Sequence, residues 1–476
     1  MTGKLVASID EAVARIRDGA SIAVGGFGGA GSPAELVAAL ARTSRRDLHI
    51  IANGGAGDSY ARLAAEHRVR KLSMGFVFGG PWHDPVLAGD IEIEVLPQGT
   101  LSERLRAGGA GIPAFYTPAS VGTALCDGTF PRRFAADGRP AELAEPKEVR
   151  LFDGRPYVLE HGLRPDFGFV KAAKADRLGN LYFRFSARNF NPAVAMAARC
   201  TIVQAQEIVE PGELEPADIH LPAVFVDILV HVPKDAELPS PPRRRSSRIA
   251  AEAAAGESGQ KVGFTREQVA QNIGRDIGAG WYVNLGLGIP LLAAKYVDAG
   301  KLVTMHMENG VLGAGGPPEV PDPDLTDAGG QPISLRAGAS IIDSATSFAL
   351  VRAGYLDLSV LGGLQVSARG DLANWYIPGG QTGVGGAMDL VQGAKRVWVA
   401  MEHTDRFGQP KIVSECTLAP TGLGVVSRVY TELGVFSLED GPLELTELAP
   451  GVSVEYVRAR TGASFRVRAG AGETAR

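Results

Sequence analysis

The tripeptide Glu308-Asn309-Gly310 joins a carboxylate to a turn-forming glycine. It follows an apolar, alternating stretch from Leu302 to Met307, a pattern that predicts a β-strand. In an open parallel α/β sheet, ligands bind at the carboxyl ends of the strands, where this tripeptide would lie. The glycine would let backbone and ligand approach closely. The carboxylate of Glu308 could act as a nucleophile, as a general base, or only as a cap for a turn or helix.

A second glycine-rich segment, residues 25–31, could bind an anion. It lies between a predicted buried strand, Ser21 to Val24, and a predicted helix whose first residue is Pro33. We expect Ser32 to be the N-cap of that helix and Glu35 to complete a capping box. A strand, a glycine loop and a helix N-terminus form an anion site because unpaired N–H groups face the ligand. The alternative is a tight turn without a ligand, and the segment matches neither a P-loop nor a dinucleotide-binding motif.

Ordered sequence blocks extend over nearly the whole chain. The two segments above belong to signatures that run from Asp18 to Pro33 and from His306 to Gly313. The other blocks, in chain order, are residues 96–100, 103–111, 115–118, 174–180, 187–190, 370–375 and 385–390. Together they resemble family I coenzyme A transferases of the succinyl-CoA:3-ketoacid type, with the two subunit-like halves fused in one chain.

The resemblance implies that Glu308 is the catalytic nucleophile. Such an enzyme moves CoA from a short acyl-CoA, such as succinyl-CoA, to a 3-oxoacid such as acetoacetate or 3-oxoadipate. The carboxylate would form a glutamyl-CoA thioester in a ping-pong cycle. One thioester replaces another, so we expect no cofactor other than CoA as a substrate, and no metal. The alternatives are an acetate- or propionate-type CoA-transferase of the same family, an acyl-CoA hydrolase on the same scaffold, and a non-enzymatic sensor.

The resemblance also implies supporting residues. The oxyanion or CoA-binding candidates are Gln98, Asn284, Gly385, Gly386, Gly25, Gly26, Phe27, Gly28, Gly29, Ala30 and Gly31, and the substrate-pocket candidates are Asn53, Phe76 and Trp82. Without the resemblance, the glycines and amides are ordinary turn residues. His83, His306 and His403 have no metal-ligand spacing, so we expect them in the core or on the surface.

Three positions depart from the family pattern. Met307 stands where relatives usually carry serine, and Gly330 stands where they usually carry lysine. The segment 75–84 is more apolar than in 3-ketoacid enzymes. A buried carboxylate without a cationic partner is costly, so we expect poorer handling of dicarboxylates than in typical relatives.

Composition indicates a water-soluble enzyme of more than one domain. The chain has 476 residues, of which 45% are hydrophobic and 21% charged. The net charge of −5 argues against nucleic-acid binding. Three cysteines suggest a reducing compartment without disulfides. The uncharged residues 107–126 are too rich in Gly, Pro, Ser and Thr for a membrane span, and the N-terminus lacks an apolar signal core. We expect a cytoplasmic homo-oligomer, most simply a dimer, with no membrane or nucleic-acid partner.

The chain divides once, between two predicted domains. We place an N-terminal domain at 1–232, a linker at 233–262 and a C-terminal domain with Glu308 at 263–476. The linker is rich in Pro and Ser and contains an arginine run, 243–248, which could bind an anionic partner or be a solvated tether. A short helix is predicted near 249–255.

The two predicted domains repeat one pattern. Residues 166–181 align without gaps with 357–372, and the segment from Ser21 matches the one from Tyr282. Short β-branched runs alternate with helical patterns, which favours parallel sheets. We therefore predict two tandem, related open α/β domains of the CoA-transferase type, with mostly parallel sheets, flanking helices and a ligand cleft between them. Thr265 to Gln268 predicts a second capping box, opening a helix that ends near Gly278.

Overall fold

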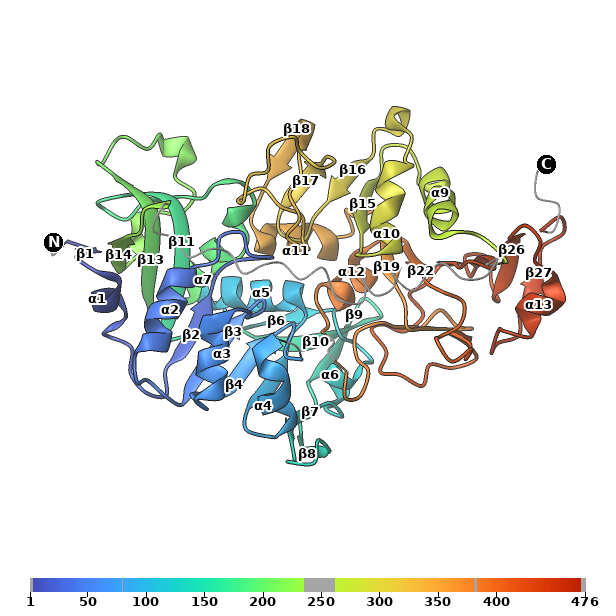
Figure 1. The fold of residues 1–476 in the computed structure, drawn as a ribbon, viewed down its shortest axis with the longest axis horizontal. Coiled ribbons are helices and arrows are strands. Elements are labelled where there is room, and N and C mark those ends of the chain that lie inside the picture. Colours follow the sequence, from blue (N-terminus) through green and yellow to red (C-terminus); the bar gives the residue numbers. More distant parts are fainter. Residues whose placement is uncertain (1–2, 79, 235–261, 381–382, 472–476) are drawn as a thin grey trace.

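The computed structural model describes residues 3–78, 80–234, 262–380 and 383–471. It has two α/β halves, one before and one after residues 235–261, and Figure 1 shows them side by side. The short helix and the arginine run predicted for the linker lie outside the described residues. The exact limits of the two domains stay a prediction.

The N-terminal half is built on a sheet with the strand order β1-β14-β13-β11-β2-β3-β4-β5, to which β12 adds beside β11. All neighbours along this order are parallel, and only β12 is antiparallel. The strands are β1 Leu5–Val6, β2 Ser21–Val24, β3 Leu48–Ala52, β4 Val69–Met74, β5 Glu92–Val95, β11 Phe167–Asp176, β12 Leu181–Tyr182, β13 Cys200–Val209 and β14 Ile228–His231. The central strands have apolar, largely buried residues, as expected for a parallel sheet covered on both faces.

The C-terminal half has a sheet with the order β18-β17-β16-β15-β19-β22-β24-β25-β26-β27. The five strands from β16 to β24 are parallel, antiparallel strands extend the sheet at both sides, and β27 adds parallel to β26 at one edge. The strands are β15 Tyr282–Leu285, β16 Thr304–His306, β17 Val311–Ala314, β18 Leu335–Ile341, β19 Leu358–Gly362, β22 Val397–Ala400, β24 Arg428–Tyr430, β25 Gly434–Ser437, β26 Glu444–Leu448 and β27 Arg466–Val467. The predicted α/β class with mostly parallel sheets is confirmed.

Helices and three small sheets complete the described chain. The α-helices are α1 Ile9–Val13, α2 Ala34–Arg42, α3 Asp58–Ala65, α4 His83–Leu87, α5 Gln98–Gly109, α6 Ala124–Asp127, α7 Asn191–Ala197, α9 Arg266–Asp276, α10 Ile289–Leu292, α11 Ser344–Arg352, α12 Ala387–Gly393 and α13 Val454–Arg458. The small sheets join β6 Ala114–Thr117, β10 Arg155–His161 and β9 Val149–Phe152; β7 Pro131–Phe134 and β8 Pro140–Leu143; and β21 Leu372–Ala373, β20 Gln365–Ser367 and β23 Ile412–Val413.

The predicted repeat is visible in the strand register. In the N-terminal half Ile22 of β2 lies opposite Phe167 of β11, and in the C-terminal half Val283 of β15 lies opposite Leu358 of β19. Each pair is preceded by an aspartate with the same function. The carboxylate of Asp166 accepts a hydrogen bond from the N–H of Ser21 (2.9 Å), and the carboxylate of Asp357 accepts one from the N–H of Tyr282 (3.0 Å). The two halves are therefore copies of one structural unit.

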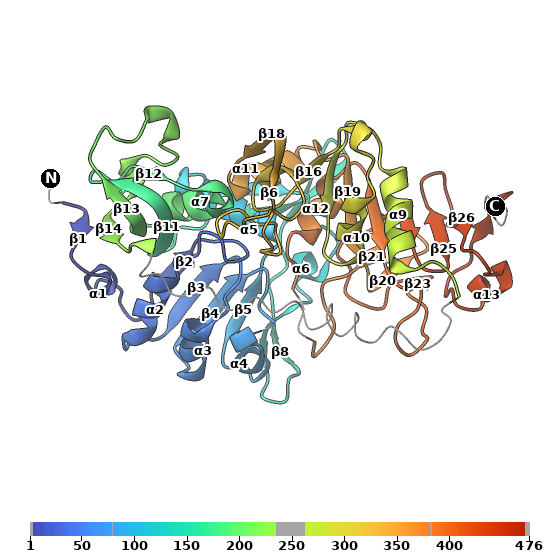
Figure 2. The same cartoon turned by 45° about the horizontal axis from the view of Figure 1, so that its top comes forward.

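Three helices pack together where the halves meet. Helix α5 of the N-terminal half contacts α11 and α12 of the C-terminal half. Figures 1 and 2 both show this group near the middle of the molecule, between the two large sheets. At this junction the N–H of Gln98, the first residue of α5, donates to the carbonyl of Gly385, next to the start of α12 against which Glu308 packs. This is the region where the sequence predicts the ligand cleft.

Helix starts were predicted with mixed success. The capping box at Thr265 is confirmed, since its hydroxyl accepts from the N–H of Gln268, whose side chain accepts from the N–H of Thr265. The capping box at Ser32 and Glu35 is wrong. Helix α2 starts one residue later, with Pro33 as N-cap and no side-chain cap.

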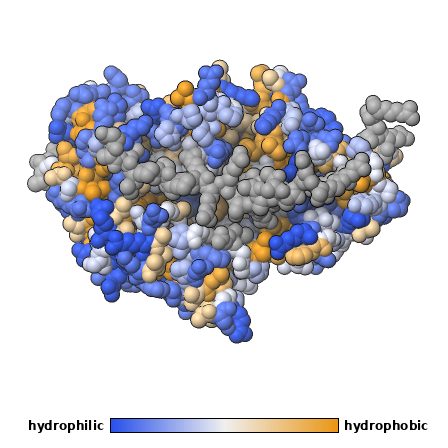
Figure 3. Space-filling model, viewed as in Figure 1, coloured by the Kyte–Doolittle hydropathy of each residue, from blue (hydrophilic) through white to orange (hydrophobic). Residues whose placement is uncertain are grey.

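Among the helices of the described residues, none is both long and apolar enough to cross a bilayer. In Figure 3, the coloured part of the surface is mostly hydrophilic, with several separate hydrophobic areas.

Candidate functional site

Glu308 lies in a tight turn at the carboxyl end of β16. The N–H of Gly310 donates to the carbonyl of Met307 (2.9 Å), which closes the turn around Glu308. Gly310 has φ +105°, and a Cβ atom built on it would lie 1.9 Å from the carbonyl oxygen of Ile342. Only glycine fits this position, so the turn that follows the predicted strand is confirmed. The strand itself is shorter than predicted, because Leu302 is in the left-handed region at φ +50°.

The side chain of Glu308 packs against the start of α12. A Cβ atom built on Gly386 would lie 2.9 Å from both Cδ and Oε1 of Glu308, and 3.1 Å from Cε1 of Phe348. Gly386 is the N-cap of α12. The lack of a side chain there lets the carboxyl group reach the helix start, with the ring of Phe348 on α11 beside it.

Glu308 has a second carboxylate close by. Burial and, as the smaller cause, the charge of Asp389 on α12 together raise the pKa of Glu308 to about 7. Burial also raises the pKa of Asp389 to about 6, although Arg352 and the N–H groups of Gly99 and Thr100 oppose the rise. A carboxylate with a raised pKa is more basic, and hence a better nucleophile, than an ordinary one.

Gln98 brings the N-terminal half to this site. It is the first residue of α5, and its N–H donates to the carbonyl of Gly385 in the other half (2.9 Å). Its side chain donates to Oδ1 of Asn53 (2.6 Å), while its own Oε1 is buried with no hydrogen-bond partner among the described residues. If both amides turn over, Asn53 donates to Gln98 instead, and the NH₂ group of Gln98 is free for an oxyanion. The structure thus brings together Gln98, Asn53 and Gly385, all predicted site residues.

Phe76 covers the segment that leads to Gly386. Its ring lies 3.2 Å from the position of a Cβ atom on Gly385 and 2.3 Å from one on Gly383. The side chain is 44% exposed, unusual for phenylalanine, so it can contact a ligand at the edge of the site. A role of Phe76 in the substrate pocket stays a prediction.

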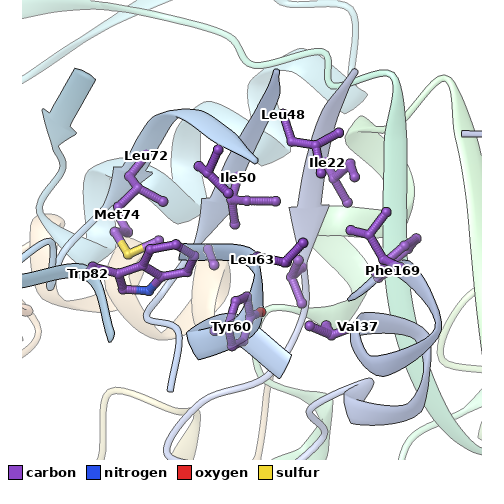
Figure 4. Close-up of a cluster of buried hydrophobic side chains, with 14 of the residues drawn as sticks. Ile22, Val37, Leu48, Ile50, Tyr60, Leu63, Leu72, Met74, Trp82 and Phe169 are labelled. Carbon is purple, nitrogen blue, oxygen red and sulfur yellow. The ribbon is translucent and has the colours of Figure 1, made fainter. Parts of the chain in front are cut away.

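Trp82 does not line a pocket, which corrects the prediction for this residue. It is fully buried in the core of the N-terminal half, where Figure 4 shows it beside Met74 and Tyr60. Its Nε1 donates to the carbonyl of Gly55 (2.9 Å), and its ring packs edge-on against Tyr60 at 5.6 Å. Since Gly55 is two residues beyond Asn53, Trp82 supports the loop that carries Asn53 from the core side.

Asn284 contacts His306, which lies two residues before Glu308. Its side chain is buried on β15, with Nδ2 3.3 Å from both Nδ1 and the carbonyl oxygen of His306. The other ring nitrogen of His306 lies 2.9 Å from the hydroxyl of Ser347 on α11. Burial lowers the pKa of His306 to about 4, so the ring is neutral at physiological pH. Contact of Asn284 with CoA stays a prediction.

The glycine loop 25–31 connects the two halves. Phe27 and Ala30 are buried and exchange two backbone hydrogen bonds (3.0 and 3.1 Å), whereas Gly28 and Gly29 between them are exposed. A Cβ atom on Gly28 would lie 3.1 Å from the backbone nitrogen of Gly330. The family lysine is replaced by glycine at this loop contact. Positive φ angles occur at Gly26, Gly28, Gly29 and Gly31, and Gly25 packs on Asn191. CoA binding by this loop stays a prediction.

Two residues at the site had no role predicted from the sequence. Asp389 lies in the block 385–390, but only the structure shows that its carboxylate reaches the other half. Phe348 lies in a region without a motif, where the sequence alone predicts an ordinary core residue. Both act through contacts with residues distant in sequence, which a single sequence does not reveal.

The comparisons agree with this geometry. The profile of the coenzyme A transferase family matches residues 6–231 and 266–460, which is most of the chain. The chain belongs to the coenzyme A transferase family.

Comparison with individual relatives shows which CoA-transferases this chain resembles. It is 41% identical over 467 residues to mouse mitochondrial succinyl-CoA:3-ketoacid coenzyme A transferase 2A, covering 96% of this chain and 88% of the relative. The beta subunit of acetate CoA-transferase from Escherichia coli is 45% identical over 205 residues, which are 43% of this chain and 94% of that subunit. About half of this chain therefore corresponds to nearly a whole subunit of a two-subunit relative.

A solved structure supports the fold. The acyl-CoA transferase of E. coli O157:H7 superimposes with a TM-score of 0.78 and 23% identity, over 98% of this chain and 94% of that chain. At this identity the match supports the architecture only.

Proposed function

We propose that this enzyme transfers CoA from a short acyl-CoA, such as succinyl-CoA, to a 3-oxoacid such as acetoacetate or 3-oxoadipate, by a ping-pong mechanism on Glu308. An oxygen of Glu308 attacks the thioester carbonyl of the donor to give a tetrahedral intermediate, which expels CoA as a thiolate and leaves a mixed anhydride between Glu308 and the acyl group. The thiolate then attacks Cδ of Glu308, which releases the donor acid and leaves a glutamyl-CoA thioester. An acceptor carboxylate reverses both steps and takes the CoA.

The observation that carries this proposal is the placement of Glu308. Its carboxyl group packs against Gly386, and Gln98 is fixed to the adjacent Gly385. Tetrahedral intermediates need fixed donors near the developing oxyanion, and the amide of Gln98 and the backbone at Gly385 and Gly386 are suited to this. Glu308 is half-buried, which limits the access of water to the acyl-enzyme. The name of the mouse relative supports the choice of substrates.

An acetate- or propionate-type transferase is the second candidate. Gly330 contributes no cation at the contact between the loops, and Phe76 adds an exposed apolar ring near Gly385. Both features favour uncharged acyl groups, such as acetyl or propionyl, over a succinyl group, which keeps one free carboxylate. The E. coli acetate CoA-transferase subunit is a relative of this kind.

Trapping the intermediate tests the mechanism. Enzyme incubated with acyl-CoA alone should accumulate CoA on Glu308, and borohydride should reduce that thioester to an alcohol with a defined mass change. Peptide mapping should place the change between His306 and Gly313. Glu308→Gln should abolish the label and lower turnover by a factor on the order of 10³ or more.

Glu432→Gln is the matched control. Burial also raises the pKa of Glu432, and its carboxylate accepts from the N–H of His403 (2.8 Å), away from Gly386. This variant should keep label and turnover. A label on another carboxylate, or near-normal transfer by Glu308→Gln, would refute the mechanism. Release of CoA without acceptor at the rate of transfer would instead indicate a hydrolase.

The assembly and location of the enzyme also stay predictions. We propose a homodimer in the cytoplasm, with CoA as a substrate and no other cofactor. Size-exclusion chromatography with light scattering tests the dimer.

A further inference from the structure

Asp389 connects the two halves beside the nucleophile. It is the third residue of α12, and its side chain is buried. Its Oδ2 accepts a hydrogen bond of 2.8 Å from the N–H of Gly99, a residue 290 positions away in the first turn of α5. Gly99 directly follows Gln98. The bond therefore fixes the start of α5 to the helix that begins at Gly386.

The contact has no spare room. A Cβ atom on Gly99 would lie 2.5 Å from Cγ of Asp389 and 2.7 Å from Cδ1 of Phe348. The same phenylalanine ring contacts the position of a Cβ atom on Gly386 at 3.1 Å. Two glycines thus let α5, α11 and α12 meet around one ring. Because packed interiors transmit small shifts, any movement of Asp389 also moves Gln98 relative to Glu308.

We infer that Asp389 is a positioning residue of the transfer reaction, which holds Gln98 in line with Gly386 and places a second negative charge beside Glu308. The inference rests on the proposed mechanism, in which Glu308 is acylated.

The charge of Asp389 favours the covalent intermediate. Glu308 is negative as a free carboxylate but neutral as a thioester, so repulsion by Asp389 disappears when Glu308 is acylated. The raised pKa of Glu308 agrees with such repulsion. The other charged groups that act on Asp389 are Arg352 of α11 and Glu160 of β10. Arg352 also pairs with Glu103 of α5 (3.5 Å), so its charge is shared.

Two substitutions distinguish the effect of the hydrogen bond to Gly99 from the effect of the negative charge of Asp389. Asp389→Asn keeps an acceptor for the N–H of Gly99 but removes the charge, whereas Asp389→Ala removes both. In the pH profile of kcat/KM, both variants should move the acid limb to lower pH by about one unit, because a like charge near Glu308 is gone. Only Asp389→Ala should also lose the plateau kcat, by about tenfold or more, while Asp389→Asn stays within about fivefold.

A second readout follows from the same repulsion. Since a change of one pKa unit corresponds to a tenfold change in equilibrium, the ratio of glutamyl-CoA enzyme to free enzyme, measured with acyl-CoA alone, should fall about tenfold in Asp389→Asn. A purely structural residue would leave this ratio and the acid limb unchanged.

Asp357→Asn is the control, because Asp357 also accepts from a backbone N–H but lies at the amino end of the C-terminal sheet. It should leave the acid limb and the adduct ratio as in wild type. An unchanged acid limb in Asp389→Asn, or a normal plateau in folded Asp389→Ala, would overturn the inference. If wild type itself forms no adduct on Glu308, the proposed mechanism fails instead.

Discussion

Replacing Glu308 by glutamine should make the protein more stable above neutral pH. The pKa of Glu308 is raised from its ordinary 4.5 to about 7, so the folded state holds the proton more tightly than the unfolded state. Folding stability therefore falls as pH rises through the range from 4.5 to 7, and the full loss is present above it. The rise corresponds to about 3 kcal/mol as an upper limit. Because the side chain is partly exposed, we expect a gain of about 1–2 kcal/mol for Glu308→Gln at pH 8.5.

Thermal unfolding at two pH values measures this effect. For a half of this size, about 1–2 kcal/mol corresponds to an increase in Tm of roughly 2–6 °C. The increase should be smaller at pH 5 and should vanish only well below pH 4.5, where Glu308 is protonated in both the folded and the unfolded wild type. Glu213→Gln, with an exposed side chain, controls for the loss of one negative charge. Equal Tm values at pH 8.5, or the same difference at both pH values, would refute the assignment of Glu308 as a desolvated carboxylate.

Three further predictions concern neighbouring positions. Gly386→Ala should lower kcat at least about 10²-fold in the transfer assay, because its Cβ would displace the carboxyl group of Glu308, 2.9 Å away. Gly330→Lys should raise kcat/KM for succinyl-CoA relative to acetyl-CoA by about tenfold. Gly330→Gln is the control, because it places a side chain at the same positive φ without a charge, and it should leave this ratio unchanged. Equal ratios in the two variants would contradict the view that a missing cation at residue 330 disfavours succinyl-CoA. Trp82→Ala should reduce the free energy of unfolding by about 3–5 kcal/mol in urea titration, and a loss below about 1 kcal/mol would contradict its core position.

Local signals predicted the backbone around the site. The strand Ser21–Val24, the glycine turn after β16 and the cap at Thr265 depend on residues a few positions apart, and all three are confirmed. The capping box predicted at Glu35 does not form, because a residue distant in sequence bonds to the start of the helix instead. Gln204 of β13 accepts from the N–H of Leu36 (3.2 Å) and donates to the carboxylate of Glu35. A side chain from the sheet thus satisfies the helix start, and Glu35 binds that side chain rather than its own backbone.

Side-chain roles at the site were harder to predict. An aromatic residue in a glycine-rich segment can face a ligand or the core. Phe76 is partly exposed at the site, whereas Trp82, six positions later, is buried in the core. The direction depends on what packs behind the segment, here Tyr60 and Gly55 for Trp82. Asp389 shows the same limit, since its partner Gly99 belongs to the other half.

The shared register of the two halves has a consequence for how the site arose. Ile22 lies opposite Ile50 in the N-terminal sheet, and Val283 lies opposite Met305 in the C-terminal sheet. Three residues after these partners come Asn53 and Glu308, so the amide and the nucleophile occupy the same place in the duplicated unit. In an ancestral pair of identical halves, the same residue would have followed the corresponding strand in each half, at one shared junction. Divergence left the charge on one end and a hydrogen-bonding amide on the other, which turned a symmetric assembly into a site with one reactive side and one supporting side.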